Sequence, residues 1–242
     1  MKKGKIYGIG LGPGDPELIT LKSANIIKSS HYIFFFKKKN SDSRALNIVE
    51  DIIRNDAHKI ALEFPVTTEI DYKKKEYKDA LKKFYEECVV KMDNILEKSI
   101  NICLLCEGDP FFYGSFIHIF ERLKERFEIE IIPGVTGMSG AWSATRIPMV
   151  SGNEIMTILM GTLNEKKLKS QIKKSDVLVI MKIGKNFKKI FRVFKDENLL
   201  DKAYLISDAT TRKEKIYKLN EIDVKTVPYF SIILLKKTIE VI

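Results

Sequence analysis

The chain has 242 residues, with 42 Lys or Arg against 32 Asp or Glu and a formal net charge of +10. With 45% hydrophobic and 31% charged residues, the composition excludes a disordered or collagen-like chain and allows one large domain or two small ones. The charge favours an anionic partner. Only 7 of the 42 cationic residues are Arg, however, and Arg is the residue on which nucleic-acid-binding proteins depend most.

The three cysteines are too few for a disulfide framework and indicate a reducing compartment, so we expect a cytoplasmic protein. Residues 6–12 run into Pro13-Gly14-Asp15-Pro16 without the long apolar stretch of a secretory signal. The longest apolar run, residues 32–36, has the length of a strand and not of a membrane span. We therefore expect no membrane partner.

Short apolar runs alternate with longer segments of helical periodicity, which predicts an α/β protein with a mainly parallel sheet and crossover helices. The predicted strands are Lys5–Ile9, His31–Phe36, Lys59–Leu62, Asn101–Cys106, Glu128–Ile132, Ile155–Met160, Val177–Met181, Ala203–Ile206 and Phe230–Leu235. The predicted helices are Leu18–Lys28, Tyr72–Lys98, Tyr113–Phe127 and Lys185–Lys195. Asp15 and Pro16 suit the cap and the first turn of the first of these helices.

We place a domain boundary after the fourth strand–helix unit. This gives an N-terminal α/β domain over residues 1–126 and a C-terminal α/β domain over residues 127–242. From Ile216 onward the helical pattern is lost, and the sequence predicts antiparallel strands with a polar connection at Asn220–Pro228. The lysine runs at residues 37–39 and 73–75 are typical of a solvated loop and a helix face.

A glycine-rich turn follows the first predicted strand, with the sequence Gly-Ile-Gly-Leu-Gly-Pro-Gly-Asp over residues 8–15. Such glycines let backbone N–H groups approach a ligand closely. A dinucleotide fingerprint needs its glycines to run straight into a helix, and Pro13 and Asp15 interrupt that geometry. An oxidoreductase that uses a dinucleotide is therefore disfavoured, and without a following Gly-Lys-Ser/Thr a Walker A loop is excluded.

Two further glycine-rich turns follow predicted strands. Residues 106–114 place Glu107 and Asp109 in a rigid turn at the carboxyl end of a strand, where open α/β sheets bind ligands. Asp109 alternatively caps the helix that we expect near Tyr113. Residues 132–140 form a turn before a helix of small residues, which suits a flat ligand or a tight helix–strand contact. Three such turns together indicate a ligand site.

The Cys-x-x-Cys spacing of Cys103 and Cys106 lies inside a predicted strand, where residues three apart point to opposite faces. With no second pair, we predict strand packing and no metal site. We interpret Phe34–Phe36 as core strand residues and His118 as structural.

These motifs resemble the tetrapyrrole methylase family. The resemblance rests on Gly-x-Gly-x-Gly-x-Gly-Asp-Pro-x-Leu-x-Thr-Leu-Lys over residues 8–22, Glu-Gly-Asp-Pro-x-x-Tyr-Gly-Ser over 107–115 and Pro-Gly-Val-Thr over 133–136, and it covers essentially the whole chain. It implies two α/β domains of the class III S-adenosylmethionine (SAM) methyltransferase type with the active site in the cleft between them. It also implies SAM as methyl donor, S-adenosylhomocysteine as product, and a homodimer.

Within the family, residues 108–116, 138–144 and 179–184 resemble the C-20 methyltransferases of cobalamin biosynthesis, which act on precorrin-2 or cobalt-factor II. The implied partner is a tetrapyrrole that carries several carboxylates, with or without cobalt. Methylation at C-11 or C-17 is the alternative. The interpretation as a nucleic-acid-binding protein rests on the net charge alone. Because the sequence lacks an RNP, KH or helix-turn-helix signature, we expect no nucleic-acid partner.

The resemblance also implies site residues, position by position. The implied cofactor contacts are Pro13, Glu107, Gly108, Asp109, Phe112, Thr136, Gly137, Met181, Lys182, Ile183, Ala209 and Thr210. The expected substrate contacts are Gly12, Asp15, Arg44, Tyr113, Ser115 and Trp142. If the reaction needs a base, the candidates are Asp15, Asp109 and Tyr113, with Glu107 and His118 after them. Glu107 is expected to pair with the amino group of the cofactor or with Lys182.

One departure from the family pattern bears on the substrate. Sirohaem-type relatives carry an Asp at the end of the second strand, and the corresponding residue is Phe36, which argues against uroporphyrinogen methylation. For the chemistry, we expect an electron-rich meso carbon to attack the methyl group directly. Backbone carbonyls of residues 107–110 and 181–184 are expected to orient that methyl group through weak C–H···O contacts. Candidate cations for the carboxylates of the substrate are Lys37–Lys39, Arg44, Arg146 and Lys182.

Overall fold

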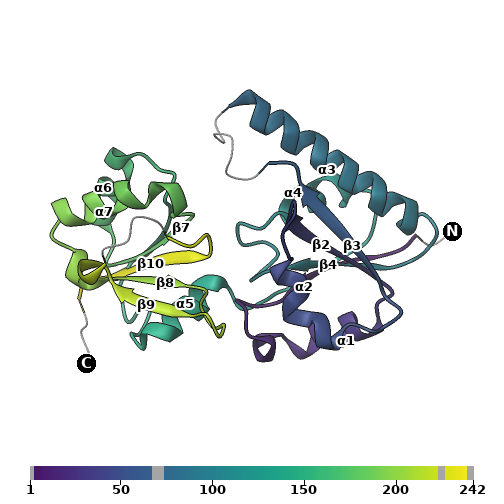
Figure 1. Ribbon diagram of the computed structural model, residues 1–242, viewed down its shortest axis with the longest axis horizontal. Coiled ribbons are helices and arrows are strands. Elements are labelled where there is room, and N and C mark those ends of the chain that lie inside the picture. The colour runs from purple at the N-terminus through teal and green to yellow at the C-terminus, as the bar shows by residue number, and fades with distance from the viewer. Residues whose placement is uncertain (1–2, 67–73, 223–226, 239–242) are drawn as a thin grey trace. The chain divides into compact units, whose positions relative to one another are not determined.

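The computed structural model describes residues 3–66, 74–222 and 227–238, and the chain divides into two compact units, Met1–Thr136 and Gly137–Ile242 (Figure 1). Each unit is built on its own five-stranded sheet with helices on both faces, which confirms the α/β prediction. The predicted boundary at residue 126 needs correction. Strand β5 (Ile129–Ile132) pairs with β1 (Ile6–Gly10) and therefore belongs to the first unit.

The sheet of the first unit is parallel throughout, with the order β3-β2-β4-β1-β5. Its remaining strands are β2 (Tyr32–Lys38), β3 (His58–Phe64) and β4 (Ile102–Cys106). In the register, Gly10 lies opposite Cys106, and Ile9 lies opposite Ile132. The carboxyl ends of β4, β1 and β5 therefore lie side by side at one edge, which brings the three glycine-rich turns together.

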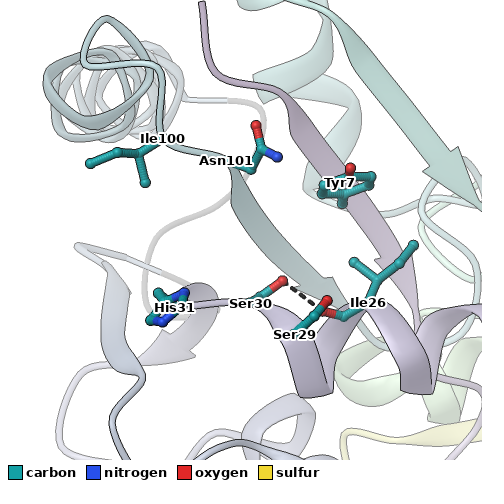
Figure 2. Close-up of a pocket in the computed structure, with 7 residues that line it drawn as sticks. All are labelled: Tyr7, Ile26, Ser29, Ser30, His31, Ile100 and Asn101. Atoms are coloured by element: carbon teal, nitrogen blue, oxygen red, sulfur yellow. Dashed lines mark hydrogen bonds between the residues drawn. The ribbon is translucent and has the colours of Figure 1, made fainter.

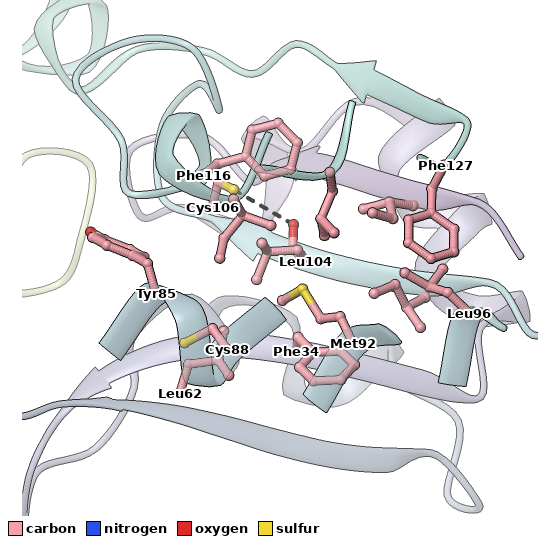
Figure 3. Packing of buried hydrophobic residues seen from close by; sticks show 14 of the residues in the cluster. Phe34, Leu62, Tyr85, Cys88, Met92, Leu96, Leu104, Cys106, Phe116 and Phe127 are labelled. Atoms are coloured by element: carbon pink, nitrogen blue, oxygen red, sulfur yellow. Dashed lines mark hydrogen bonds between the residues drawn. The ribbon is translucent and has the colours of Figure 1, made fainter. Parts of the chain in front are cut away.

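Helices cover both faces of this sheet. They are α1 (Leu21–Ser29) and α2 (Arg44–Val49) on one face, and α3 (Lys75–Leu96) and α4 (Phe116–Leu123) on the other. Figure 3 shows the side covered by α3, where Cys106 packs with Phe34 and Phe116. Cys103 packs on the opposite side. The two cysteines of the Cys-x-x-Cys spacing thus point to opposite faces, as predicted.

The cysteines are free thiols buried in the core. Burial raises the pKa of Cys88 and of Cys103 to about 12, and it raises the pKa of Cys106 as well. These thiols therefore stay protonated at neutral pH, and a protonated thiol is a poor nucleophile. Within the described ranges, no group of three His, Cys, Asp or Glu residues is placed to hold a metal ion.

Helices α1 and α4 each begin three residues later than predicted. Asp15 caps only the short 3₁₀ helix Pro16–Leu18, whereas Thr20 caps α1 by accepting a hydrogen bond from the Ser23 backbone N–H at 3.1 Å. Helix α4 begins at Phe116 because Tyr113 has a φ of 56°, which a helix cannot contain. Helix α2 has only six residues, too few for the periodicity that predicts a helix. Tyr72, Lys73 and residues 223–226 of the polar connection lie outside the described residues.

The sheet of the second unit is mixed, so the expectation of a mainly parallel sheet holds only for the first unit. Its order is β6-β7-β10-β8-β9. The strands are β6 (Met156–Met160), β7 (Val177–Met181), β8 (Ala203–Ser207), β9 (Lys215–Lys218) and β10 (Ser231–Lys236). Strand β10 is antiparallel to both β7 and β8, and β9 is antiparallel to β8, which confirms the antiparallel pattern expected after Ile216.

Helix α5 (Gly137–Thr145) covers one face of the second sheet, and α6 (Glu165–Lys174) and α7 (Phe187–Asp196) cover the other. The remaining short 3₁₀ helices are Glu50–Ile52, Gly184–Asn186, Leu200–Lys202 and Leu219–Glu221. Among the residues that the structure describes, no helix is both long enough and apolar enough to cross a membrane.

A buried ion pair in the second unit predicts a pH dependence of stability. The Lys236 ammonium donates to the Glu154 carboxylate at 2.9 Å and to the Pro148 carbonyl oxygen at 3.2 Å. The pKa of Glu154 lies below its usual 4.5, and the largest cause is the hydrogen bond from Lys236. Because the folded-state pKa is depressed, this stabilisation is present above the unfolded pKa and is lost as pH falls through the folded pKa.

We therefore expect Glu154→Gln to lower the free energy of unfolding at pH 7, and we expect the difference from wild type to shrink as pH falls below about 4.5. Urea unfolding at several pH values measures it. Glu97→Gln is the control, because Glu97 pairs with Lys3 at an exposed position where ion pairs contribute little. A Glu154→Gln difference that stays constant across this pH range would contradict the assignment.

Candidate functional site

The three glycine-rich loops at the carboxyl edge of the first sheet are joined to one another. The Gly108 N–H donates to the Gly12 carbonyl at 2.7 Å, and the Gly12 N–H donates back to the Gly108 carbonyl at 3.3 Å. The Gly134 N–H donates to Asp109 Oδ2 at 3.1 Å. Residues 10–14, 107–114 and 133–136 therefore form one structure, which we call the glycine cluster.

Backbones in the glycine cluster approach more closely than any side chain would allow. A Cβ atom on Gly134 would lie 2.2 Å from the Gly108 carbonyl oxygen, and one on Gly10 would lie 2.5 Å from the Gly134 nitrogen. Gly12 and Gly108 also have φ values of 79° and 67°, which favour glycine. Gly10 and Gly134 were not among the predicted contacts, although a glycine directly after a strand is a signal for such an approach.

Asp109 connects two of these loops through its carboxylate. Oδ1 accepts from the Phe111 N–H at 2.9 Å, and Oδ2 accepts from the Gly134 N–H. The alternative that Asp109 caps α4 is wrong, because both contacts are to loop backbone. Since each oxygen already serves a backbone N–H, the carboxylate fixes the turn and is poorly suited to the role of a base.

Arg44 lies at the start of α2 and contacts the first loop. Its Nη2 donates to the Pro13 carbonyl at 3.0 Å. Desolvation raises the pKa of the Glu107 carboxyl, and the Arg44 charge and a backbone hydrogen bond from Ala45 oppose that shift. Glu107 is itself exposed, so water offsets part of the desolvation. In the first unit, Arg44 thus acts on Glu107 by its charge and holds the Pro13 loop by a hydrogen bond. Its contact with the substrate stays a prediction.

Several other predicted substrate contacts have internal partners. Gly12 is buried and uses both backbone polar groups in its bridge to Gly108. Asp15 Oδ1 accepts from the Glu17 N–H at 2.9 Å, and the Ser115 hydroxyl hydrogen-bonds Tyr85 of α3, whose pKa burial raises to about 12. Tyr113 is 47% exposed and packs edge-on against Phe112, with ring centroids 5.0 Å apart.

The prediction that Trp142 contacts the substrate needs correction, because Trp142 belongs to the core of the second unit. It is 4% exposed and lies on the face of α5 that packs against Val177, Val179 and Ile206. Its indole N–H finds no hydrogen-bond partner among the described residues. A side chain enclosed in this way cannot contact a large ring, so the expectation that Trp142 lines the substrate site is wrong.

The predicted cofactor contacts of the second unit lie at one edge of its sheet. Because β10 is antiparallel to both of its neighbours, β7 and β8 run in the same direction and end at the same edge. Met181 ends β7 and is followed by Lys182 and Ile183, whereas Ala209 and Thr210 follow β8. Lys182 and Thr210 have φ values of 54° and 65°, and such uncommon backbone conformations cluster at functional sites.

The carbonyls expected to face a methyl group have roles within the loops. In the first unit, the Gly108 and Asp109 oxygens accept from the N–H groups of Gly12 and Phe112. In the second unit, the Met181 oxygen accepts from the Gly161 N–H at 2.7 Å. These hydrogen bonds shape the turns, and because each carbonyl oxygen has two lone pairs, its orientation of a methyl group through C–H···O contacts stays a prediction.

A cavity of about 250 Å³ opens at the opposite, amino edge of the first sheet (Figure 2). Its walls include Tyr7, His31 and Ser30, whose hydroxyl donates to the Ile26 carbonyl at 2.6 Å. None of the predicted site residues lines it, so we do not connect it with the glycine cluster.

Comparison with known proteins identifies relatives along the whole chain. The family model described as Tetrapyrrole (Corrin/Porphyrin) Methylases matches residues 5–223. A precorrin-2 C(20)-methyltransferase from Sinorhizobium sp is 36% identical and covers 96% of this chain and 94% of its own. A probable cobalt-precorrin-2 C(20)-methyltransferase from Methanocaldococcus jannaschii is 32% identical and covers 96% of each chain.

A solved structure shares the fold. It is the uroporphyrin-III C-methyl transferase from Thermus thermophilus, complexed with S-adenosylhomocysteine. The TM-score is 0.65 at 19% identity, with 97% of this chain and 98% of that chain covered.

Proposed function

Because this chain belongs to the tetrapyrrole (corrin/porphyrin) methylases, we propose that it transfers a methyl group from SAM to C-20 of precorrin-2 or its cobalt-containing counterpart in cobalamin biosynthesis. The observation that carries the proposal is the glycine cluster, in which the family motifs form one joined structure. The two C-20 relatives support the substrate class, one without and one with cobalt in its name. Methylation at C-11 or C-17 is the alternative.

The residues present fit a cationic cofactor. SAM carries a positive sulfonium and an ammonium group, and the exposed Glu107 carboxylate lies beside the half-buried Asp109 at the glycine cluster. We propose cofactor contacts at Pro13, Glu107–Asp109, Phe112 and Thr136 in the first unit, and at Gly137, Met181–Ile183 and Ala209–Thr210 in the second. Ile183 is fully buried in the core of the second unit, so it supports this turn from the inside.

In the proposed reaction, bound SAM supplies a methyl group that its sulfonium already activates. The chain positions the reactants, and positioning can contribute roughly 7–11 kcal/mol in favourable systems. Asp109 holds the turn from Gly108 to Phe111 against Gly134, and Arg44 holds the Pro13 loop. If the reaction needs a base, we propose Tyr113, because its side chain is 47% exposed at the glycine cluster, whereas both Asp109 oxygens hold backbone N–H groups.

The net charge of +10 supports a substrate with several carboxylates, because a positive surface raises the local concentration of an anion. Lys37 is an unsuitable candidate contact, since its ammonium pairs with Glu63 at 2.9 Å. Lys38, Lys39, Arg146 and Lys182 are exposed and are the candidates that we keep for this role. We also propose a homodimer, as the family resemblance implies, and a cytoplasmic location, which three free thiols support.

A thermal-shift measurement on the full chain tests the cofactor assignment. We expect S-adenosylhomocysteine to raise the melting temperature, since a ligand at 100 times its Kd stabilises the folded state by about 2.7 kcal/mol. We expect no rise with NAD(H), which tests the oxidoreductase alternative, and none with an oligonucleotide, which tests nucleic-acid binding. A rise with either of these ligands, and none with S-adenosylhomocysteine, would overturn the proposal.

A further inference from the structure

Lys189, in the first turn of α7, connects two loops at the carboxyl edge of the second sheet. Its Nζ donates to the Gly161 carbonyl at 2.6 Å, to the Leu163 carbonyl at 2.5 Å and to Asn186 Oδ1 at 3.2 Å. These three acceptors match the three N–H donors of an ammonium group. One side chain therefore ties the loop after β6 to the turn after β7.

The two loops also meet backbone to backbone. The Gly161 N–H donates to the Met181 carbonyl at 2.7 Å. A Cβ atom on Gly161 would lie 2.9 Å from the Lys182 carbonyl oxygen and 3.1 Å from Ile183 Cα. Since Lys182 already has a φ of 54°, the shape of the turn after β7 depends on where the loop after β6 is held.

The position of Lys189 is unfavourable for the helix itself. A cation in the first turn meets the positive end of the helix dipole, and the first turn of α7, which is described in full, contains no acidic residue. The three oxygen acceptors offset this cost, because hydrogen bonds to a charged donor are stronger than those between neutral groups. The contacts with the loops therefore explain why a lysine suits this position.

We propose that Lys189 is a positioning residue for SAM binding, which acts by holding Gly161 and Leu163 against the turn at Met181–Ile183. This inference rests on the proposed function, because the cofactor contacts at that turn belong to it. Lys189→Met keeps most of the apolar side chain and removes the donors. We expect the Kd for S-adenosylhomocysteine and the KM for SAM to rise at least about tenfold, with the KM for the tetrapyrrole unchanged.

Two matched variants separate positioning from general destabilisation. Lys188→Met removes the charge of the neighbouring exposed residue, and Val193→Ala weakens the core beneath the same helix. We expect both to bind S-adenosylhomocysteine with the wild-type Kd. If Val193→Ala raises the Kd as much as Lys189→Met does, the effect is one of stability and the inference is overturned.

The test uses calorimetric titration with S-adenosylhomocysteine, together with amide hydrogen exchange of the free protein. In Lys189→Met we expect the Gly161 amide to exchange faster than in wild type. Asn186→Ala, which removes one acceptor, is expected to give a smaller change in the same direction and serves if Lys189→Met does not fold. Wild-type affinity and wild-type exchange in these variants would overturn the role of Lys189 alone, whereas a wild-type protein that binds no S-adenosylhomocysteine would overturn the proposed function itself.

Discussion

Gly134→Ala is expected to lower kcat/KM for methyl transfer by at least about 100-fold and to weaken binding of S-adenosylhomocysteine. The added Cβ would lie 2.2 Å from the Gly108 carbonyl oxygen and 2.9 Å from Gly10 Cα, and both neighbours are backbone atoms that cannot rotate away. The loops of the glycine cluster must therefore separate. A displacement of about 1 Å in a catalytic site can cost roughly 100-fold in rate.

The control for Gly134→Ala is an equally severe clash at the other edge of the same sheet. A Cβ on Gly4 would lie 2.0 Å from the Ile100 carbonyl oxygen. We expect Gly4→Ala to lower the melting temperature and to leave the Kd for S-adenosylhomocysteine and the KM for SAM close to wild type. Similar losses of affinity in the two variants would show that the effect comes from stability, and wild-type kinetics in Gly134→Ala would contradict the functional role of the cluster.

Asp109→Ala is expected to raise the Kd for S-adenosylhomocysteine and to lower kcat/KM by about 100-fold. The substitution removes the acceptors of the Phe111 and Gly134 N–H groups. Hydrogen bonds to a charged group contribute about 1.5–3 kcal/mol each, and 1.4 kcal/mol corresponds to about tenfold in an equilibrium constant. Asp109→Asn keeps one acceptor oxygen, so we expect a smaller loss of about tenfold. Calorimetric titration and steady-state kinetics measure both variants.

Asp176→Ala is the matched control for Asp109. Asp176 Oδ2 accepts from the Ile155 N–H at 2.8 Å in the second unit, so its removal also leaves a backbone donor without its carboxylate. We expect reduced stability and unchanged kinetics. An Asp109→Asn protein with full affinity for S-adenosylhomocysteine and full turnover would show that the turn does not depend on this carboxylate.

Nine of the ten strands in the described part of the chain were predictable because each contains a short apolar run between polar segments, whereas the exposed β9, with the sequence Lys-Ile-Tyr-Lys, has no such run. The pattern of Val177–Met181, for example, needs no tertiary information. Strand direction and order are less accessible, since the antiparallel insertion of β10 between β7 and β8 depends on contacts distant in sequence. The observed domain boundary differs from the predicted one for the same reason, because the pairing of β5 with β1 forms only in the folded sheet.

The candidate site was predictable where several residues form a motif. The three glycine-rich turns each follow a predicted strand, and because parallel strands end at a common edge, these turns lie close together. Single residues were harder, since a residue type does not reveal its partner. Arg44 and Ser115 suit a polar substrate, yet they contact Pro13 and Tyr85, and Trp142 is enclosed in the core. Lys189 carries no motif, and only its three acceptors distinguish it.

Methyl transfer to C-20 is tested most directly by the position of the new methyl group in the product. Anaerobic incubation of the full chain with ¹³C-methyl SAM and precorrin-2, and in parallel with the cobalt-containing substrate, is followed by mass spectrometry and NMR. We expect one labelled methyl group at C-20 with at least one of the two substrates, and stoichiometric S-adenosylhomocysteine. A label at C-11 or C-17, or no transfer to either substrate by a protein that binds S-adenosylhomocysteine, would contradict the assignment.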